Sequence, residues 1–212
     1  MHQGRYLVFE GVVGTGKTTQ SKRLVEELKK RFPEREIIWT REPGGSEIAE
    51  AIRVLVQGTP FTEQMDPMCE AYLYASARAQ SLRTVVLPVL ARGGIVVSDR
   101  SFCTSIAWQG FGRGLGFETI LEVNKTSIKD ILPDLIIEMD LDPEIGLKRT
   151  FDARGDKFET MPIEFFRSCV EGYRTLANHE LLNNRWKRID GQGTPDDVFT
   201  RVIEAVLPSV II

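Results

Sequence analysis

The segment Gly11–Thr18 constrains the fold of this chain more than any other part of its sequence. It reads Gly-Val-Val-Gly-Thr-Gly-Lys-Thr and matches the pattern Gly-x-x-x-x-Gly-Lys-[Ser/Thr] without a gap. The apolar run Tyr6–Phe9 precedes it, and a segment with helical spacing of apolar residues, Ser21–Phe32, follows it. A strand, this loop and a helix, in that order, are the context in which the pattern binds phosphate groups. We therefore interpret the segment as a phosphate-binding loop.

The residue types in the loop explain how it would bind a nucleotide. Its glycines let the backbone turn tightly and bring N–H groups close to phosphate oxygens. The N-terminus of the following helix adds partial positive charge. Lys17 can reach the β- and γ-phosphates of ATP, and the Thr18 hydroxyl can bind Mg²⁺. The residues expected to contact ATP here are Gly11, Val12, Val13, Gly14, Thr15, Gly16, Lys17, Thr18 and Thr19.

Short apolar runs alternate with helical segments along the rest of the chain. The runs predicted as strands are residues 5–10, 37–40, 94–98, 135–139 and 186–189. The predicted helices are residues 21–32, 46–56, 68–91 with a bend near Pro88, 117–129, 143–150, 163–183 and a last one from 194. This alternation predicts an α/β fold with a five-stranded parallel sheet covered by helices on both faces. With the phosphate-binding loop, it indicates the three-layer P-loop NTPase fold.

The 212 residues are expected to form one domain, 1–212, with an irregular lid segment at about 150–162. A polar, glycine-rich connection is expected at 109–116. Parallel α/β sheets bind ligands beyond the carboxyl ends of their strands. Because the segments 11–18, 41–45 and 99 onward each follow a predicted strand, we expect them to meet at one edge of the sheet.

Composition excludes several classes of function. A net charge of −3 argues against a general nucleic-acid binder. The three cysteines are widely spaced and form no Cys-x-x-Cys pair, which indicates neither a zinc site nor a disulfide framework. A reducing cytoplasm is the simplest expectation. The chain runs directly into a predicted strand and has no apolar run of about 18 residues, so we expect neither a signal peptide nor a membrane span.

Basic residues recur near the predicted strand ends and in the lid segment. Taken singly, each could lie on a solvated surface. Taken together they fit phosphoryl transfer, which needs cations around the transferred group. Arginine suits phosphate oxygens, and a loop that carries arginines can close over them and exclude water. The residues concerned are Arg41, Arg53, Arg78, Arg100, Arg149, Arg154 and Lys157.

The chain resembles the thymidylate (dTMP) kinases, in particular the bacterial type in which the lid loop carries the additional basic residues. The resemblance runs from about residue 5 to about residue 205. The matching pieces are residues 9–18, 40–45, 75–80, 99–100, 105–110, 112–115 and 154–159. The most specific of them are Thr-Arg-Glu-Pro-Gly-Gly at 40–45 and the Asp-Arg pair at 99–100 with the Gln-Gly pair at 109–110.

The resemblance implies a reaction in which ATP and dTMP give ADP and dTDP, with Mg²⁺ as cofactor. It implies that Lys17, Arg100 and Arg154 act in catalysis and that Thr18 and Asp99 lie at the metal. Arg149 and Gln192 would add to the ATP site, with Gln192 near adenine. It also implies a homodimer, which the apolar content of the helices at 46–56 and 68–91 permits.

The resemblance further implies an acceptor site. Arg53 and Arg100 would hold the phosphate of dTMP, and Arg78 and Gln109 would read the edge of its base. Tyr74 replaces a phenylalanine that stacks on thymine, and Trp108 replaces an aromatic residue beside the sugar. The full set of expected acceptor-binding residues is Glu42, Arg53, Tyr74, Arg78, Arg100, Ser105, Trp108 and Gln109.

The chain departs from the family at four positions. Val13 stands where an acid usually contacts the 3′-hydroxyl of the sugar, so weakened sugar binding or altered acceptor choice is one hypothesis. Ser101 stands for a tyrosine, Ala77 for an acid or asparagine, and Lys157 for an arginine.

Two alternatives remain open at this point. The chain could be a related kinase that acts on another nucleotide or on a deoxynucleoside, with Glu10 as its base. It could instead be a catalytically degenerate protein that binds ATP without turnover. A switch GTPase is disfavoured, because the sequence has no Asn-Lys-x-Asp segment to read guanine.

Overall fold

Five parallel strands form one sheet in the computed structural model, which describes residues 3–58, 62–150 and 161–210. Every neighbouring pair in the order β2-β3-β1-β4-β5 is parallel. The predicted strands are confirmed, with ends that differ by one residue at most. Their bounds are β1 (Arg5–Glu10), β2 (Ile37–Arg41), β3 (Ile95–Asp99), β4 (Leu135–Asp140) and β5 (Trp186–Asp190).

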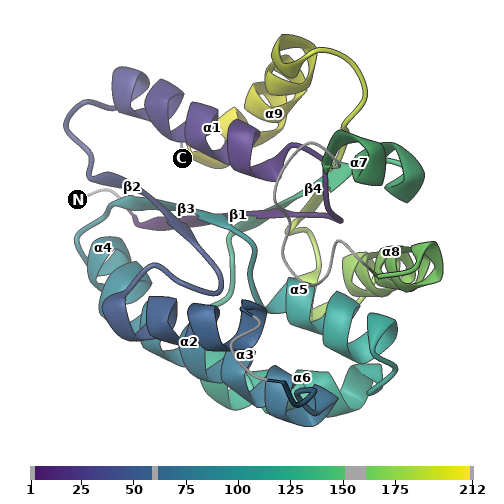
Figure 1. Ribbon diagram of the computed structural model, residues 1–212. Helices are drawn as coiled ribbons and strands as arrows, with labels where there is room; N and C mark the ends of the chain where they lie inside the picture. Colours follow the sequence, from purple (N-terminus) through teal and green to yellow (C-terminus); the bar gives the residue numbers. More distant parts are fainter. Residues whose placement is uncertain (1–2, 59–61, 151–160, 211–212) are drawn as a thin grey trace.

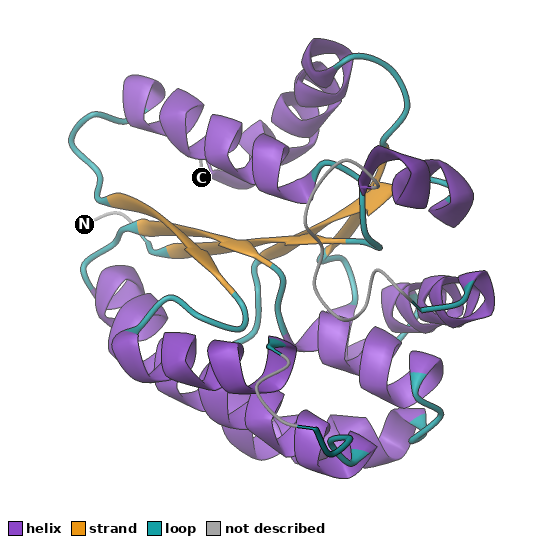
Figure 2. Ribbon diagram, viewed as in Figure 1, coloured by secondary structure: helices purple, strands orange, loops and turns teal. Residues whose placement is uncertain are grey.

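Helices cover both faces of this sheet, as predicted. Figures 1 and 2 show α1 (Lys17–Arg31) and α9 (Pro195–Val210) on one face and most other helices on the opposite face. Alternate side chains of a strand point to opposite faces. Accordingly Leu7 and Phe9 of β1 pack in the core beneath α1 and α9, whereas Tyr6 and Val8 pack in the core of the other layer.

The opposite layer begins with α2 (Glu47–Gln57), whose predicted cap is confirmed. The Ser46 hydroxyl accepts the Ala49 N–H at 3.4 Å. The expected helix at 68–91 consists of three pieces: α3 (Pro67–Ser81), a wide π-helical turn η1 (Leu82–Val86) and α4 (Leu87–Ala91). Pro88 has no N–H to continue the α-helical ladder. The irregularity therefore lies in the wide turn just before the proline.

The segment after β3 differs from the prediction. A polar connection was expected at 109–116, but the chain is helical from α5 (Phe102–Ser105) through the wide turns of η2 (Ile106–Gly112). Ser101 caps the start, since its hydroxyl accepts the Cys103 N–H at 3.2 Å. A Cβ on Gly172 of α8 (Ile163–Ala177) would lie 2.7 Å from the Ala107 Cα. This close packing on α8 orders a segment that its glycines alone would leave irregular.

The remaining helices follow the predictions with one correction. α6 (Phe117–Ile128) and α7 (Pro143–Thr150) lie where they were expected. The helix predicted to reach residue 183 ends at Ala177, and a short 3₁₀ turn, η3 (Glu180–Leu182), follows. The Asn178 amide donates back to the Arg174 carbonyl at 2.9 Å, which is a contact that ends helices. Within the described ranges, every helix falls short of the length and apolarity needed to cross a bilayer.

Candidate functional site

The phosphate-binding loop joins β1 to α1 and packs directly against α7. Gly14 has a φ of 69°, and a Cβ on it would lie 1.9 Å from the Gly146 carbonyl oxygen. A Cβ on Gly146 would in turn lie 2.4 Å from the Val13 carbonyl oxygen. Neither position has room for a side chain. The sequence analysis did not single out Gly146, although a glycine inside a predicted helix is a signal of close packing.

Lys17 and Thr18 begin α1, where Lys17 turns back onto the loop and Thr18 contacts the end of β3. The Lys17 ammonium donates to the Val12 carbonyl and to the Thr15 hydroxyl, and the Thr18 hydroxyl donates to the Asp99 carboxylate. The described residues contain no cluster of three or more His, Cys, Asp or Glu side chains that could hold a metal. Thr18 and Asp99 nevertheless offer the oxygen donors that Mg²⁺ takes when phosphates and water complete its coordination.

The pKa of Lys17 is lowered to about 7, mainly by burial. The nearby Arg100 guanidinium also lowers this pKa, and its effect is larger than the opposite effect of the Asp99 carboxylate. Lys17 is then mostly neutral at pH 8 in the free protein, whereas bound phosphates raise its pKa and favour the ammonium. Binding of ADP at pH 8 is expected to take up about one proton, and ADP affinity is expected to fall as pH rises above 7.

Calorimetry of ADP binding in two buffers of different ionisation enthalpy measures this uptake. At pH 6 Lys17 is already charged, so the uptake is expected to be close to zero there. Equal apparent enthalpies in the two buffers at pH 8 would contradict the assignment.

A cavity of about 270 Å³ lies beside the loop, and we call it the cationic cavity. Five basic side chains line it, compared with two carboxylates, Glu42 and Asp99. Both carboxylates already have partners, Arg78 for Glu42 and Thr18 for Asp99. Val13 adds an apolar wall. This excess of positive charge suits polyanions such as phosphate groups. The basic residues are Lys17, Lys22, Arg41, Arg53 and Arg100. Lys22 was not among the residues predicted from the sequence.

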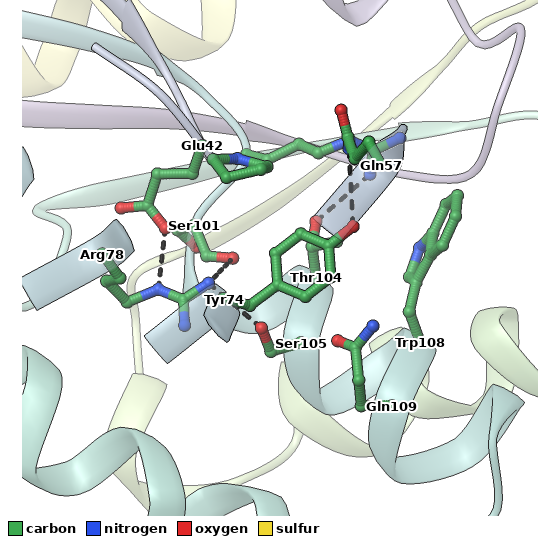
Figure 3. Close-up of a pocket in the computed structure, with 11 residues that line it drawn as sticks. Glu42, Gln57, Tyr74, Arg78, Ser101, Thr104, Ser105, Trp108 and Gln109 are labelled. Atoms are coloured by element: carbon green, nitrogen blue, oxygen red, sulfur yellow. Dashed lines mark hydrogen bonds and ion pairs between the residues drawn. The ribbon is translucent and has the colours of Figure 1, made fainter. Parts of the chain in front are cut away.

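A second, smaller hollow opens from the cationic cavity, and we call it the narrow hollow. Figure 3 shows Tyr74, Trp108 and Gln109 gathered around it. Its free volume of about 30 Å³ holds one or two waters, so a nucleobase needs its walls to move apart. The narrow hollow and the cationic cavity share three lining residues, Glu42, Gln57 and Arg100. The two spaces therefore form one continuous cleft.

Arg78 lies at the end of the narrow hollow and is tied to the protein through several donors. Its Nε donates to the Glu42 carboxylate at 2.7 Å, and Nη1 donates to the Asn124 side chain. Its Nη2 donates to the Ser101 carbonyl at 3.2 Å and the Ser105 hydroxyl at 3.1 Å. Burial raises the pKa of Glu42, and the charge of Arg78 opposes that rise. The pair therefore fixes the floor of the hollow.

Gln109 presents an acceptor at the same hollow. Its Nε2 donates to the buried Glu70 carboxylate at 2.8 Å, which fixes the orientation of the amide. Its Oε1 is buried and has no hydrogen-bond partner among the described residues. A buried carbonyl oxygen without a partner is costly unless a ligand supplies the donor.

A third cavity, of about 280 Å³, lies on the other side of the loop, between α1 and the start of α9. Arg149 lines it and donates to the Gly191 carbonyl at 3.4 Å. Gln192 does not line this cavity: its N–H donates to Asp190 and its carbonyl accepts from Arg201. Among the loop residues, Thr15, Gly16 and Thr19 face it. The predicted lid residues Arg154 and Lys157 lie outside the described residues.

Arg100 stands where the narrow hollow meets the cationic cavity. Its backbone φ is 79°, in the left-handed region. Its Nη1 donates to the Gly11 carbonyl at 3.2 Å and to the Thr104 hydroxyl at 3.1 Å. Its guanidinium carbon lies 4.8 Å from the centre of the Trp108 ring. Arg100 thus bridges the phosphate-binding loop and the wall of the narrow hollow.

A parallel sheet whose first strand leads into a phosphate-binding loop defines a P-loop NTPase. The continuous cleft formed by the cationic cavity and the narrow hollow lies beside that loop. Within this class, the thymidylate kinase family model matches residues 9–202. The chain belongs to the thymidylate kinase family.

Similar proteins cover nearly the whole chain. A thymidylate kinase of Geobacillus thermodenitrificans is 40% identical over 96% of this chain and 90% of its own length. One of Ligilactobacillus salivarius is 38% identical over 92% of this chain and 94% of its own. The crystal structure of thymidylate kinase from Ehrlichia chaffeensis matches with a TM-score of 0.77 and 26% identity, covering 96% of this chain and 99% of that one.

Proposed function

We propose that this protein transfers the γ-phosphoryl group of ATP to dTMP, giving dTDP and ADP. The observation that carries the proposal is the continuous cleft beside the phosphate-binding loop. Its cationic cavity would hold the phosphate of the acceptor between Lys17, Arg53 and Arg100, while the narrow hollow would take the base. ATP would lie along the loop, with its adenosine toward the third cavity and Arg149.

The narrow hollow supports a pyrimidine with an N–H donor on its edge. The unpartnered Oε1 of Gln109 can accept that N–H, while Tyr74 and Trp108 supply aromatic surface. Cytosine has a lone pair at the corresponding ring nitrogen and would leave Gln109 unpaired, so such a site rejects it. Ser105 and Glu42 act by holding Arg78 in place.

Charge neutralisation supports catalysis in this arrangement. The acceptor phosphate is already anionic, so positioning and cations can replace a general base. Thr18 and Asp99 would hold Mg²⁺, which would offset the negative charge of the phosphates. Glu10, the base of the nucleoside-kinase alternative, is wholly buried and accepts hydrogen bonds on both carboxylate oxygens. This burial weighs against that alternative.

The proposal includes the remaining expectations from the sequence. The chain would act in the cytoplasm as one domain, with a lid at about 150–162 that brings Arg154 to the phosphates. Exposed apolar side chains on α2 and α3, namely Ile48, Val54 and Tyr72, support a homodimer through that surface. Sedimentation velocity measures the oligomeric state.

The decisive experiment measures ADP release with MgATP against dTMP, dUMP, UMP, dCMP, dGMP and thymidine. Strong preference for dTMP supports the proposal. Preference for thymidine or another nucleotide moves the function to a related kinase. ATP binding without turnover of any acceptor would favour the degenerate alternative.

Val13 gives a prediction about the acceptor. Its side chain lines the cationic cavity, where a carboxylate could accept a hydrogen bond from a sugar hydroxyl. Val13→Asp is expected to lower the KM for dTMP about tenfold, since a hydrogen bond to a charged group contributes roughly 1.5–3 kcal/mol. Steady-state kinetics tests this, with Val13→Asn as the uncharged control. Unchanged KM and kcat in Val13→Asp would contradict the idea.

A further inference from the structure

Glu10 ends β1 behind the phosphate-binding loop and collects four hydrogen bonds. Its Oε1 accepts from the Ser101 N–H at 2.8 Å and the Ser101 hydroxyl at 2.7 Å. Its Oε2 accepts from the Thr104 hydroxyl at 2.6 Å and the Tyr173 hydroxyl at 3.1 Å. A buried carboxylate that accepts four hydrogen bonds from the protein cannot contact a substrate. Glu10 can therefore affect the reaction only through the residues that donate to it.

Those partners reach Arg100, which lines the cationic cavity, and Gly11, which begins the phosphate-binding loop. The Thr104 hydroxyl accepts from Arg100 Nη1 at 3.1 Å, and the Tyr173 hydroxyl lies 3.4 Å from the Gly11 carbonyl. Arg100 Nη1 also donates to that same carbonyl at 3.2 Å. The contacts form a closed ring through Glu10, Thr104, Arg100, Gly11 and Tyr173.

Arg100 needs such support. A non-glycine residue in the left-handed region is strained and persists only where its surroundings determine it. Its φ is 79°. Glu10 places a carboxylate behind the guanidinium, and Thr104 transmits this contact by donating to Glu10 while accepting from Arg100. Burial raises the pKa of Glu10, whereas Thr104, Arg100, Ser101 and Tyr173 lower it.

Helix α8 brings Tyr173 to this ring and also supports the narrow hollow. Phe165 and Phe166 of the same helix meet the Trp108 ring edge-on, with centroids 5.6 and 6.1 Å away. Trp108 in turn lies under the Arg100 guanidinium. Helix α8 therefore supports Arg100 on two sides: Tyr173 contacts Glu10 behind the guanidinium, and Phe165 and Phe166 pack against Trp108 beside it.

We propose that Glu10, Thr104 and Tyr173 are positioning residues that hold the Arg100 guanidinium in place for the phosphates and fix the Gly11 carbonyl, to which Arg100 donates, at the start of the phosphate-binding loop. The role of Tyr173 is to join α8 to the phosphate-binding loop through its hydroxyl. This rests on the proposed function, because Arg100 is taken to contact the transferring phosphates.

The test removes single hydroxyls with little change in volume. Tyr173→Phe and Thr104→Val are each expected to lower kcat/KM for dTMP about tenfold, while the Kd for ADP stays near the wild-type value. Thr104→Ser keeps the hydroxyl and is expected to recover most of the loss. The double variant Tyr173→Phe/Thr104→Val is expected to lose less than the product of the single losses, because both act on Arg100.

Thr175→Val is the matched control, since Thr175 is exposed on the same helix and its hydroxyl donates only to the Glu171 carbonyl. Its kinetics should equal those of the wild type. If Tyr173→Phe and Thr104→Val lower the melting temperature but match Thr175→Val in kcat/KM, the residues only stabilise the fold and the inference is wrong. An equal loss of ADP affinity would also overturn it.

Failure of the proposed function would show in the wild-type protein itself, as absence of dTMP turnover. The positioning role is then decided by calorimetric titration with inorganic phosphate in the presence of saturating ADP, because ADP occupies the phosphate-binding loop and leaves the cationic cavity beside Arg100 for the added anion. Binding several-fold weaker than wild type in Tyr173→Phe and Thr104→Val, but not in Thr175→Val, would support it. Equal affinities would refute it.

Discussion

Replacing Arg100 by alanine is expected to lower kcat for dTMP phosphorylation about a thousandfold, the scale seen when an arginine leaves a phosphoryl-transfer site. Arg100 is the side chain that borders both the cationic cavity and the narrow hollow while contacting the loop carbonyl of Gly11. Its charge reaches Lys17, whose pKa it depresses. ADP affinity at pH 6 should change little, because Lys17 is charged there with or without Arg100 and Arg100 does not line the third cavity.

Steady-state kinetics and calorimetry measure the two quantities. Arg100→Lys keeps the charge but not the planar fork, so it should recover only part of the rate. Arg174→Ala is the matched control: this arginine is 56% exposed on α8, and its partner among residues 3–58, 62–150 and 161–210 is the surface carboxylate of Glu171. A fall in kcat of less than about tenfold in Arg100→Ala would show that the cleft does not place this residue at the transferring group.

Arg78→Met is expected to destabilise the folded protein by about 3–5 kcal/mol, because it leaves the Glu42 carboxylate buried without its cation. The two side chains are 3% and 4% exposed, and their Nε–Oε2 distance is 2.7 Å. The Asn124 side chain and Ser105 hydroxyl lose a donor in the same change. The midpoint of urea unfolding, followed by circular dichroism, measures the effect.

The double variant Arg78→Met/Glu42→Leu removes both charges and is expected to regain much of the stability, yet not the activity toward dTMP. Arg92→Met is the control: Arg92 forms an exposed pair with Glu36, with 57% and 41% exposure, and its loss should leave the urea midpoint nearly unchanged. A loss in Arg78→Met no larger than in Arg92→Met would show that the buried pair contributes nothing to folding.

The phosphate-binding loop, the five strands and the capped helix at Ser46 could be read from the sequence because each depends on neighbouring residues. Apolar runs identify buried parallel strands, and the loop pattern carries its own backbone requirements. The grouping of Arg53, Tyr74 and Arg78 with Arg100 came from the family resemblance, and the structure places all four around one cleft.

Predictions failed where distant segments decide the outcome. The glycines of 109–116 suggested an irregular connection, but packing on α8 makes residues 102–112 helical. That Gln192 lies near adenine stays a prediction: its neighbours Gly191 and Gly193 line the third cavity, while its own backbone pairs with Asp190 and Arg201. Tyr173 was not predicted at all, since a tyrosine in an amphipathic helix looks like an ordinary core residue.

The fold class, the phosphate-binding loop and the kind of chemistry at one edge of the sheet follow from the amino-acid sequence alone, because they depend on contiguous patterns of apolar residues, glycines and charge. Which side chains support that chemistry depends on how the folded chain brings distant residues together. Glu10 and Tyr173 lie 163 residues apart in the chain, and Gly14 and Gly146 are similarly remote, yet each pair is in contact. Such contacts depend on how helices pack across a parallel sheet, which no local pattern encodes.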